Sequence, residues 1–445
     1  MLYTLYDRFI LSNRQTFSIF VYESLGFCKI YPAREKNTIR RNITMFKKVL
    51  SLCLAALMLA TLCVSFSACG NTADDDFKLG VILLHDEAST YDLNFIEAVN
   101  RAAEQLGLSE DQVLFKKNID ESNDCYEAAA DLVDAGCDVI FADSFGHETY
   151  LLKAAKEFTD VQFCHATGTM AHTEKLANFH NAFASIYQGR FLAGVAAGMK
   201  LNEMIEAGKI TAEQAKIGYV GAFTYAEVMS GYTSFYLGAK YICPSVTMDV
   251  QFTGSWYDEL EEKNAANALM DRNCVLISQH ADSMGAPTAC EERNVPNVSY
   301  NGSTLASCPN TFIVSSKIDW TPYFVLICEA VMNGTEIPVD YTGTISTGSV
   351  ALTDVNGQAA AAGTQEKIDE IKAKLVAGEI NVFDTSFFTV GNETLTSYMA
   401  DVDTDEAYAK DTEVIADGYF HESEYRSAPY FDIRIDGITL VNEKY

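Results

Sequence analysis

Strand-like and helix-like segments alternate along most of this chain, in two successive series. In the first series, apolar runs of strand length are separated by segments whose apolar residues recur every three to four positions. The expected strands are 77–84, 113–117, 138–142 and 161–166, and the expected helices are 90–106, 126–135 and 147–158. Such alternation predicts a parallel sheet with right-handed helical crossovers.

The same alternation restarts after residue 189. The expected helices are 189–200, 229–239, 258–270 and 286–293, and the expected strands are 216–222, 246–252, 274–278 and 297–300. The first of these helices is rich in small residues, which suits close helix packing. The last third adds a strand at 311–315, a helix at 322–332, an extended stretch at 346–353 and a helix at 365–378.

Two α/β series of this kind predict two doubly wound, Rossmann-like lobes joined by a hinge. A ligand is expected in the central cleft, outside the carboxyl ends of the strands. We expect residues 77–182 with part of 316–345 to form the first lobe, and residues 183–315 with part of 346–391 to form the second. Residues 392–445 are acidic and tyrosine-rich, and we expect an irregular C-terminal extension there.

Residues 45–68 have the layout of a secretory signal peptide. Lys47 and Lys48 precede an apolar run of about 16 residues, which is shorter than the roughly 20 needed to span a bilayer. Small residues then precede Cys69, as in a bacterial lipobox, although Phe66 departs from the usual leucine. We expect Cys69 to be lipidated and to anchor the chain outside the cytoplasm on the cell membrane through the tether 69–76. An uncleaved membrane anchor is the alternative.

Met45 is the expected start of the translated protein, because a signal peptide does not begin 44 residues inside a chain. Residues 1–44 mix aromatic and basic residues without sustained periodicity. We interpret them as spurious upstream translation, with a genuine N-terminal extension as the alternative.

Composition narrows the classes of partner. The net charge of −29 opposes binding to nucleic acid, which a basic surface would favour. Beyond Cys69 there are eight cysteines and no CxxC pair, which argues against a zinc site. Most lie in apolar segments, so we expect mostly free, buried thiols. We expect neither a metal nor a cofactor.

Several segments resemble the basic membrane protein (BMP) family of bacterial lipoproteins, the substrate-binding components of purine-nucleoside ABC importers. The resemblance runs from about residue 77 to 391. It rests on the order and spacing of DSFG at 143–146, FCHATG at 163–168, FLAGVAAGM at 191–199, GSWYD at 254–258, SQHADS at 278–283, SKIDW at 316–320 and AGEINVF at 377–383. It implies the fold of a type I periplasmic binding protein, with an ABC permease and its ATPase as partners.

The resemblance and the positions of residues near strand ends suggest a ligand site that holds a flat heterocycle by aromatic stacking and orients it with polar groups. Tyr91 matches the family aromatic that stacks on the base, Asn301 a family Asp that bonds ribose, and Lys317 a family Lys that contacts sugar hydroxyls. The candidate ligand-binding residues are Tyr91, Asn94, Ser144, Phe145, His165, Trp256, His280, Asp282, Asn301 and Lys317.

Six of the candidates have a structural alternative. Tyr91 and Phe145 suit packing roles, the histidines suit buried structural roles, and Trp256 suits a contact at the cleft rim. Lys317 near Asp319 suits a hinge salt bridge.

Three positions depart from the family pattern. The helix aromatic that sandwiches the base is Gly231, and two Asp positions are His165 and Asn301. The second stacking partner is then missing, or is supplied by Phe223, Tyr225 or Trp320. A related nucleobase, or another neutral aromatic or sugar-like solute, remains an alternative ligand.

Three function classes follow. The favoured one is capture of a nucleoside-like molecule by lobe closure and its delivery to a membrane permease. A surface sensor with the same lobes is the second. An enzyme is the third and is disfavoured, because the chain has no GxSxG, HExxH or P-loop motif, and no GxGxxG after the first strand.

Overall fold

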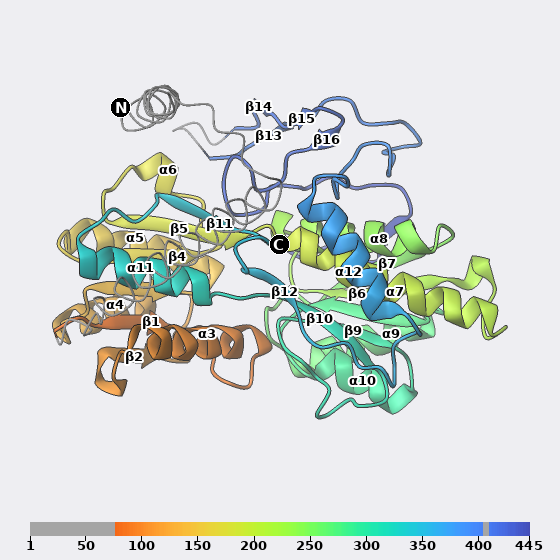
Figure 1. The fold of residues 1–445 in the computed structure, drawn as a ribbon, viewed down its shortest axis with the longest axis horizontal. Helices are drawn as coiled ribbons and strands as arrows, with labels where there is room; N and C mark the ends of the chain where they lie inside the picture. Colours follow the sequence, from red (N-terminus) through yellow and green to blue (C-terminus); the bar gives the residue numbers. More distant parts are fainter. Residues whose placement is uncertain (1–75, 404–408) are drawn as a thin grey trace, which may run out of the picture. The chain divides into compact units, whose positions relative to one another are not determined.

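The computed structural model describes residues 76–403 and 409–445, and the expectations for residues 1–44, for the signal segment and for Cys69 fall outside them. The first lobe is a six-stranded parallel sheet in the order β11-β5-β4-β3-β1-β2 (Figure 1). Its elements are β1 (Leu79–Ile82), α3 (Thr90–Leu106), β2 (Val113–Lys116), α4 (Asn123–Asp134), β3 (Val139–Ala142), α5 (Glu148–Glu157), β4 (Gln162–Ala166), α6 (Ala171–Glu174), β5 (Phe179–Ala184), α11 (Thr321–Asn333) and β11 (Asp340–Gly343).

The second lobe is a seven-stranded sheet in the order β12-β10-β9-β8-β6-β7-β17, in which only β12 runs antiparallel to its neighbour. Its elements are α7 (Ile186–Glu206), β6 (Lys216–Gly221), α8 (Ala226–Ile242), β7 (Thr247–Phe252), α9 (Glu259–Asp271), β8 (Leu276–His280), α10 (Gly285–Arg293), β9 (Asn297–Tyr300), β10 (Phe312–Ile318), β12 (Val350–Leu352), α12 (Thr364–Val376) and β17 (Ile438–Leu440).

Each sheet carries helices on both faces. In the first lobe, α3 and α11 pack apolar side chains on one face, and α4 and α5 cover the other. In the second lobe, α7, α8 and α12 share one core, and α9 and α10 share the opposite one. The predicted pair of doubly wound α/β lobes is confirmed.

Helices α7 and α8 pack closely because glycines of each helix face the backbone of the other. A Cβ on Gly194 would stand 2.0 Å from the carbonyl oxygen of Phe235, and one on Gly238 would stand 2.0 Å from that of Phe191. Only a residue without a side chain fits at either position, so the small-residue composition of the α7 segment has the packing role expected for it.

Within residues 76–403, the chain passes between the two sheets three times, after β5, after β10 and after β11. Arg101 Nη2 of α3 donates to Asp319 Oδ1 at 3.0 Å, just beyond β10, so the ion-pair partner of Asp319 is Arg101. Among residues 76–403 and 409–445, no helix combines the length and apolar composition that a bilayer crossing requires.

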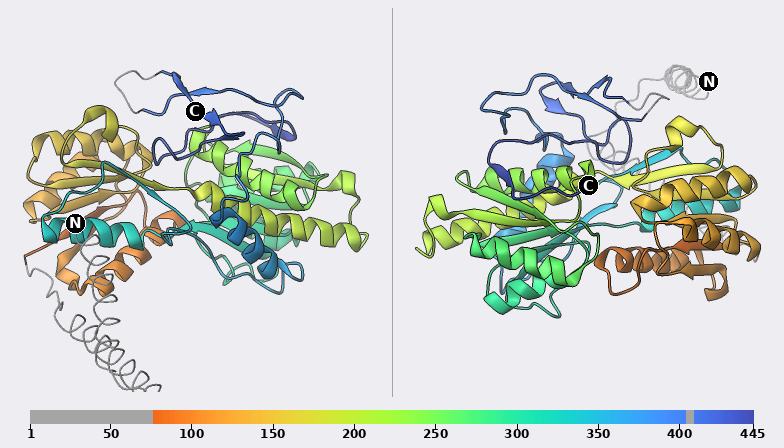
Figure 2. Two further views of the ribbon diagram at one scale, coloured as in Figure 1. Left: turned by 45° about the horizontal axis from the view of Figure 1, so that its top comes forward. Right: turned by 180° about the vertical axis from the view of Figure 1, so that it is seen from behind.

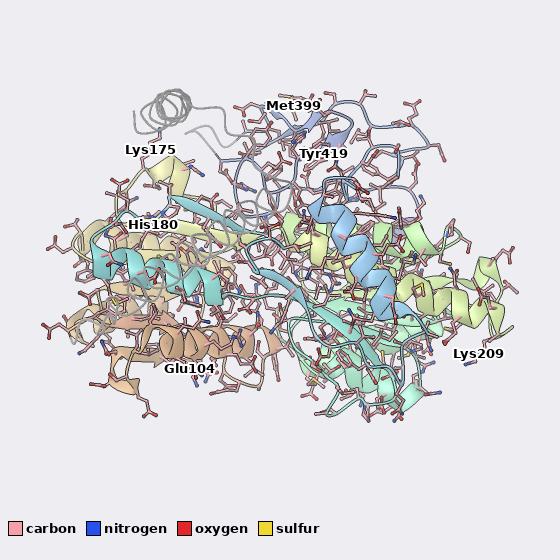
Figure 3. The ribbon with its side chains drawn as sticks, in the orientation of Figure 1. Glu104, Lys175, His180, Lys209, Met399 and Tyr419 are labelled. Atoms are coloured by element: carbon pink, nitrogen blue, oxygen red, sulfur yellow. The ribbon has the colours of Figure 1, made fainter. Side chains whose placement is uncertain are left out.

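The C-terminal segment is more ordered than its sequence suggests. It forms two small antiparallel sheets, from β13 (Met399–Ala400) with β14 (Thr412–Glu413) and from β15 (Ile415–Ala416) with β16 (Tyr419–Phe420), marked by Met399 and Tyr419 in Figure 3. Strand β17 then joins the second sheet beside β7. Figure 2 shows the segment, in dark blue, along the side of the second lobe that carries α8.

Candidate functional site

A small cavity lies at the carboxyl ends of strands from both sheets. The first lobe contributes the turns after β1, β3 and β4 and the start of α3. The second lobe contributes the start of α8, the turns after β7 and β8, and the last residues of β8 and β9. The lining residues are Leu84, His85, Tyr91, Asp92, Ser144, Phe145, Thr167, Glu227, Trp256, His280, Asp282 and Tyr300. Strand ends at this edge are where doubly wound folds place their ligands.

Aromatic rings meet across the mouth of this cavity. Phe145 of the first lobe lies 5.6 Å, centroid to centroid, from Tyr225 of the second. Tyr225 stacks on Phe223 at 5.0 Å and 13°, and Phe223 meets Trp256 edge-on at 5.2 Å. Trp320 instead stacks on Phe95 in the first-lobe core at 4.6 Å. Phe223 and Tyr225 therefore stand beside the cleft, whereas Trp320 does not.

The first-lobe wall is built on the start of α3. Ser89 caps this helix by accepting a hydrogen bond from the Asp92 amide. Asp92 Oδ1 accepts from the His85 amide at 2.7 Å, and the Asp92 and Asp143 carboxyls share a side-chain hydrogen bond. The Tyr91 hydroxyl donates to the Asp143 carbonyl at 2.8 Å. Burial, followed by the neighbouring Asp92, raises the pKa of the Asp143 carboxyl well above its usual value.

The second-lobe wall is centred on His280, the last residue of β8. Its Nε2 lies 3.5 Å from Glu227 Oε1, and its ring lies 4.5 Å from that of Tyr300. A Cβ on Gly231 would stand 2.5 Å from His280 Nδ1, so the imidazole occupies the space beside this glycine. Burial lowers the pKa of His280, which favours the neutral ring.

Asp282, two residues further on, connects the two lobes. The Thr90 amide and hydroxyl both donate to the Asp282 carbonyl, at 3.0 and 3.2 Å. The Asp282 amide donates to the Trp256 carbonyl at 3.0 Å, and its Oδ1 accepts from Asn301 Nδ2 at 3.2 Å. The helix that carries Tyr91 thus touches the turn that carries Asp282, and the lobes are in contact around the cavity.

Six of the ten predicted site residues line the cavity, namely Tyr91, Ser144, Phe145, Trp256, His280 and Asp282. The other four, Asn94, His165, Asn301 and Lys317, lie outside its lining. Asn94 Nδ2 donates to the Ile318 carbonyl at 2.6 Å, and Asn301 holds Asp282. Lys317 lies in β10, in register with Ala351 of β12.

His165 supports the lining from behind. Its Nε2 lies 2.7 Å from the Ser144 carbonyl, and burial lowers its pKa to about 4. A neutral ring that donates from Nε2 fits this contact. His165 thereby holds the turn that presents Ser144 and Phe145.

Six lining residues were not predicted from the sequence, namely Leu84, His85, Asp92, Thr167, Glu227 and Tyr300. Most of them end a strand or follow one within three residues, so their position relative to the strand ends is a usable signal. Glu227 in the first turn of α8 and Asp92 inside α3 carry no such signal.

A two-lobed α/β architecture with its cavity between the lobes defines the class of solute-binding proteins. A family model described as "ABC transporter substrate-binding protein PnrA-like" (Bmp) matches residues 80–386. The chain belongs to this family, so it is an extracytoplasmic substrate-binding protein of the ABC-transporter type, as its motifs suggested.

Three curated proteins are similar to this chain. It is 29% identical to the purine-binding protein BAB2_0673 of Brucella abortus, over 70% of this chain and 84% of that protein. It is 29% identical to the putative ABC transporter glucose-binding protein TsgA13 of Haloferax volcanii, over 56% of this chain and 60% of that one. It is also 28% identical to metabotropic glutamate receptor-like protein B of Dictyostelium discoideum, over 59% of this chain and 34% of the receptor.

Solved structures of solute-binding proteins share the fold. Those from Conexibacter woesei and Aeropyrum pernix superpose with TM-scores of 0.56 and 0.58, at 20% and 16% identity. They cover 68% and 69% of this chain, and the match covers 98% and 93% of theirs. The expected fold of a type I periplasmic binding protein is confirmed.

Proposed function

We propose that this chain captures a nucleoside-like molecule, most simply a purine nucleoside or base, and delivers it to an ABC permease and its ATPase. The observation that carries the proposal is the interlobe cavity, where aromatic side chains from both lobes flank polar groups at strand ends. Aromatic faces stack on a heterocycle, and acceptors such as the Asp92 and Asp282 carboxylates orient its N–H and O–H groups. The family of the chain and a relative named a purine-binding protein support this ligand class.

Membrane attachment through a lipid on Cys69 is the second part of the proposal. The support is the signal-like segment that precedes this cysteine. An anchored binding protein stays beside its permease, and the lobes supply the ligand-dependent change that the permease detects.

A sugar is the second candidate ligand. A relative is named a glucose-binding protein, and carboxylates that accept hydroxyl hydrogen bonds suit a sugar as well as a ribose. A ligand sensor with the same lobes is the alternative role, supported by the similarity to a receptor-like protein.

Thermal unfolding with adenosine, guanosine, inosine, adenine, guanine and glucose tests the ligand. A true ligand at 100 times its dissociation constant stabilises the folded state by about 2.7 kcal/mol and raises Tm accordingly. Phe145→Ala removes a ring that lines the cavity, and we expect it to weaken binding by up to about tenfold. Leu260→Ala, at an exposed leucine of α9, is the matched control.

Failure of all the purine compounds to shift Tm would contradict the nucleoside proposal, and a shift with glucose alone would select the sugar. Release of free base or another product in the same incubation would identify an enzyme instead.

A further inference from the structure

Carboxylates from both lobes face the same cavity. Asp92 belongs to the first lobe, and Glu227 and Asp282 belong to the second. The cavity lining contains neither lysine nor arginine. Its basic side chains are those of His85 and His280. A site with this lining is strongly biased against anionic ligands.

None of these three carboxylates has a charged partner in the cavity lining. Asp92 accepts a hydrogen bond from the His85 amide and shares a side-chain hydrogen bond with the buried Asp143 carboxyl, which carries no positive charge. Asp282 accepts from the neutral amide of Asn301. Glu227 lies beside His280, whose burial favours the neutral imidazole. Their acceptor capacity is therefore incompletely used within the protein.

The buried Arg190 lies behind this wall rather than in it. Its guanidinium lies 4.9 Å from the centroid of the Tyr300 ring and donates to the Tyr219 hydroxyl at 2.7 Å and the Ser278 hydroxyl at 3.2 Å. These contacts hold the cation in the second-lobe core. It is not among the residues that line the cavity.

The acidic groups of the two lobes act on one another across the cavity. Burial raises the pKa of Asp282 well above its usual value, and the charges of Glu262, Asp92 and Glu227 raise it further. Like charges within a partly desolvated space repel, so full ionisation of these carboxyls in the empty cavity is opposed. A ligand that carries a positive charge would reverse this effect.

The aromatic lining suits the same kind of ligand. Tyr91, Phe145, Trp256 and Tyr300 line the cavity together with the carboxylates. The faces of aromatic rings attract cations, and the attraction increases when water is excluded. Carboxylates and ring faces together form a recognised arrangement for a protonated amine or a cationic heterocycle.

We infer that the cleft selects a positively charged organic ligand, whose charge lies among Asp92 of one lobe and Glu227 and Asp282 of the other. This inference rests on the proposed function, because it specifies the charge of the ligand in the same cleft. The ligand's charge offsets the repulsion among these carboxyls, so binding favours their ionised form.

Calorimetric titration of the full chain at pH 6.5 tests the inference with matched ligands. One series is adenosine, the cationic 1-methyladenosine and adenosine 5′-monophosphate. The other is glucose, glucosamine and glucose 6-phosphate, and choline is a cation with neither base nor sugar. We expect the cationic member of the bound series to bind at least tenfold more tightly than the neutral one, and the phosphate not to bind.

The outcomes separate the two proposals. Equal or tighter binding of the neutral member overturns the charge inference and leaves the nucleoside or sugar function standing. Binding of choline alone supports the charge inference and overturns the nucleoside function. Absence of binding by every compound overturns both.

Variants provide the internal control. Asp282→Asn and Glu227→Gln each replace an ionisable carboxyl with a neutral amide. We expect the affinity for the cation to fall several-fold more than the affinity for the neutral ligand, because the amide oxygen still accepts a hydrogen bond. Glu366→Gln removes an exposed charge from α12 and should leave the ratio of cation to neutral affinity unchanged. A merely structural effect lowers both affinities together, so an unchanged ratio in both cavity variants would overturn the inference.

Discussion

Gly231 and His280 form a complementary pair at the edge of the cavity. The glycine is buried in α8, and the imidazole from β8 fills the space that a side chain would take, with Nδ1 only 2.5 Å from the position of a Cβ. The family resemblance shows that an aromatic is missing at Gly231, but it cannot show what fills the space. The two residues are far apart in the sequence, and no local pattern connects them.

Gly231→Ala should therefore destabilise the fold although alanine favours helix. Overpacking of this kind costs about 1–3 kcal/mol, because the buried imidazole must move away from Glu227 and Tyr300. Chemical denaturation measures the change, with Gly357→Ala as the control, because a Cβ at Gly357 meets no atom within 4 Å. The double variant with His280→Ala should recover part of the loss. Equal stability of the two alanine variants would contradict the pairing.

Most helices and strands were predictable from local patterns. Helix α3 spans the residues expected for it, because Ser89 caps its start and Gly107 ends it at a φ of 71°. Three strands of the two large sheets escaped prediction, as did the four short strands β13 to β16 of the C-terminal segment. β5 contains His180 and Asn181, whose side chains hydrogen-bond Pro338 and Glu148, so it lacks an apolar run (His180 is labelled in Figure 3). β11 and β17 are short edge strands whose only strand partners are distant in sequence.

The candidate site was predictable only where residues end a strand. His280 and Asp282 were found because strand ends meet at one edge of a doubly wound sheet. Glu227 was missed because its role depends on where α8 begins relative to β8. Asn301 and Lys317 were predicted as ligand-binding residues from matched family motifs, and both lie outside the cavity lining.

Strand β17 and the residues after it support the aromatic wall of the cleft. Asn442 Oδ1 accepts from the Phe252 amide at 2.7 Å, and Asn442 Nδ2 donates to the Phe252 carbonyl at 2.8 Å. The Thr224 amide donates to the Lys444 carbonyl at 2.7 Å. These contacts hold the turns that carry Tyr225 and Trp256, and they lie beyond residue 386, where the family match ends.

Asn442→Ala should weaken ligand binding without touching the ligand. Loss of two hydrogen bonds to partly buried backbone costs about 1–3 kcal/mol in stability, and the looser turns should raise the dissociation constant several-fold. Calorimetry and denaturation measure the two effects. Tyr445→Ala, at a side chain that is 73% exposed, is the control. Affinity equal to that of the control would show that the C-terminal segment does not position the wall.

At the scale of the whole molecule, the C-terminal segment adds a connection between the lobes. The Ser427 amide donates at 2.7 Å to Oδ2 of Asp340, the first residue of β11 in the first lobe. Phe420 and Tyr430 of the same segment belong to the second-lobe core. Glu422 lies between these two residues in the sequence, and its side chain is buried. Its Oε2 accepts a hydrogen bond from the Tyr430 amide at 3.2 Å. Because this segment is attached to both lobes, the stability of the lobes depends on the protonation of its buried carboxyl, Glu422.

This coupling predicts how stability depends on pH. Burial raises the pKa of Glu422 to about 8 and that of Glu262 to about 7, both above the unfolded value of 4.5. The folded state then binds more protons than the unfolded state, so the free energy of unfolding falls as pH rises from the unfolded pKa through these values. Burial lowers the pKa of His147, His165 and His180 to about 4, which makes stability rise with pH up to about 6.5.

Above pH 6.5 the histidines no longer contribute a slope, so the carboxyls alone decide the trend. We expect the free energy of unfolding to be highest near pH 6 and to fall by at least about 1–2 kcal/mol by pH 8. Denaturation at constant ionic strength between pH 5 and 8.5 measures the curve. Glu422→Gln replaces the carboxyl with a neutral isostere and should flatten the decline above pH 6.5, whereas Glu366→Gln on exposed α12 should not. A decline that is equally steep in both variants would mean that the buried carboxyl of the C-terminal segment does not control the stability of the lobes it joins.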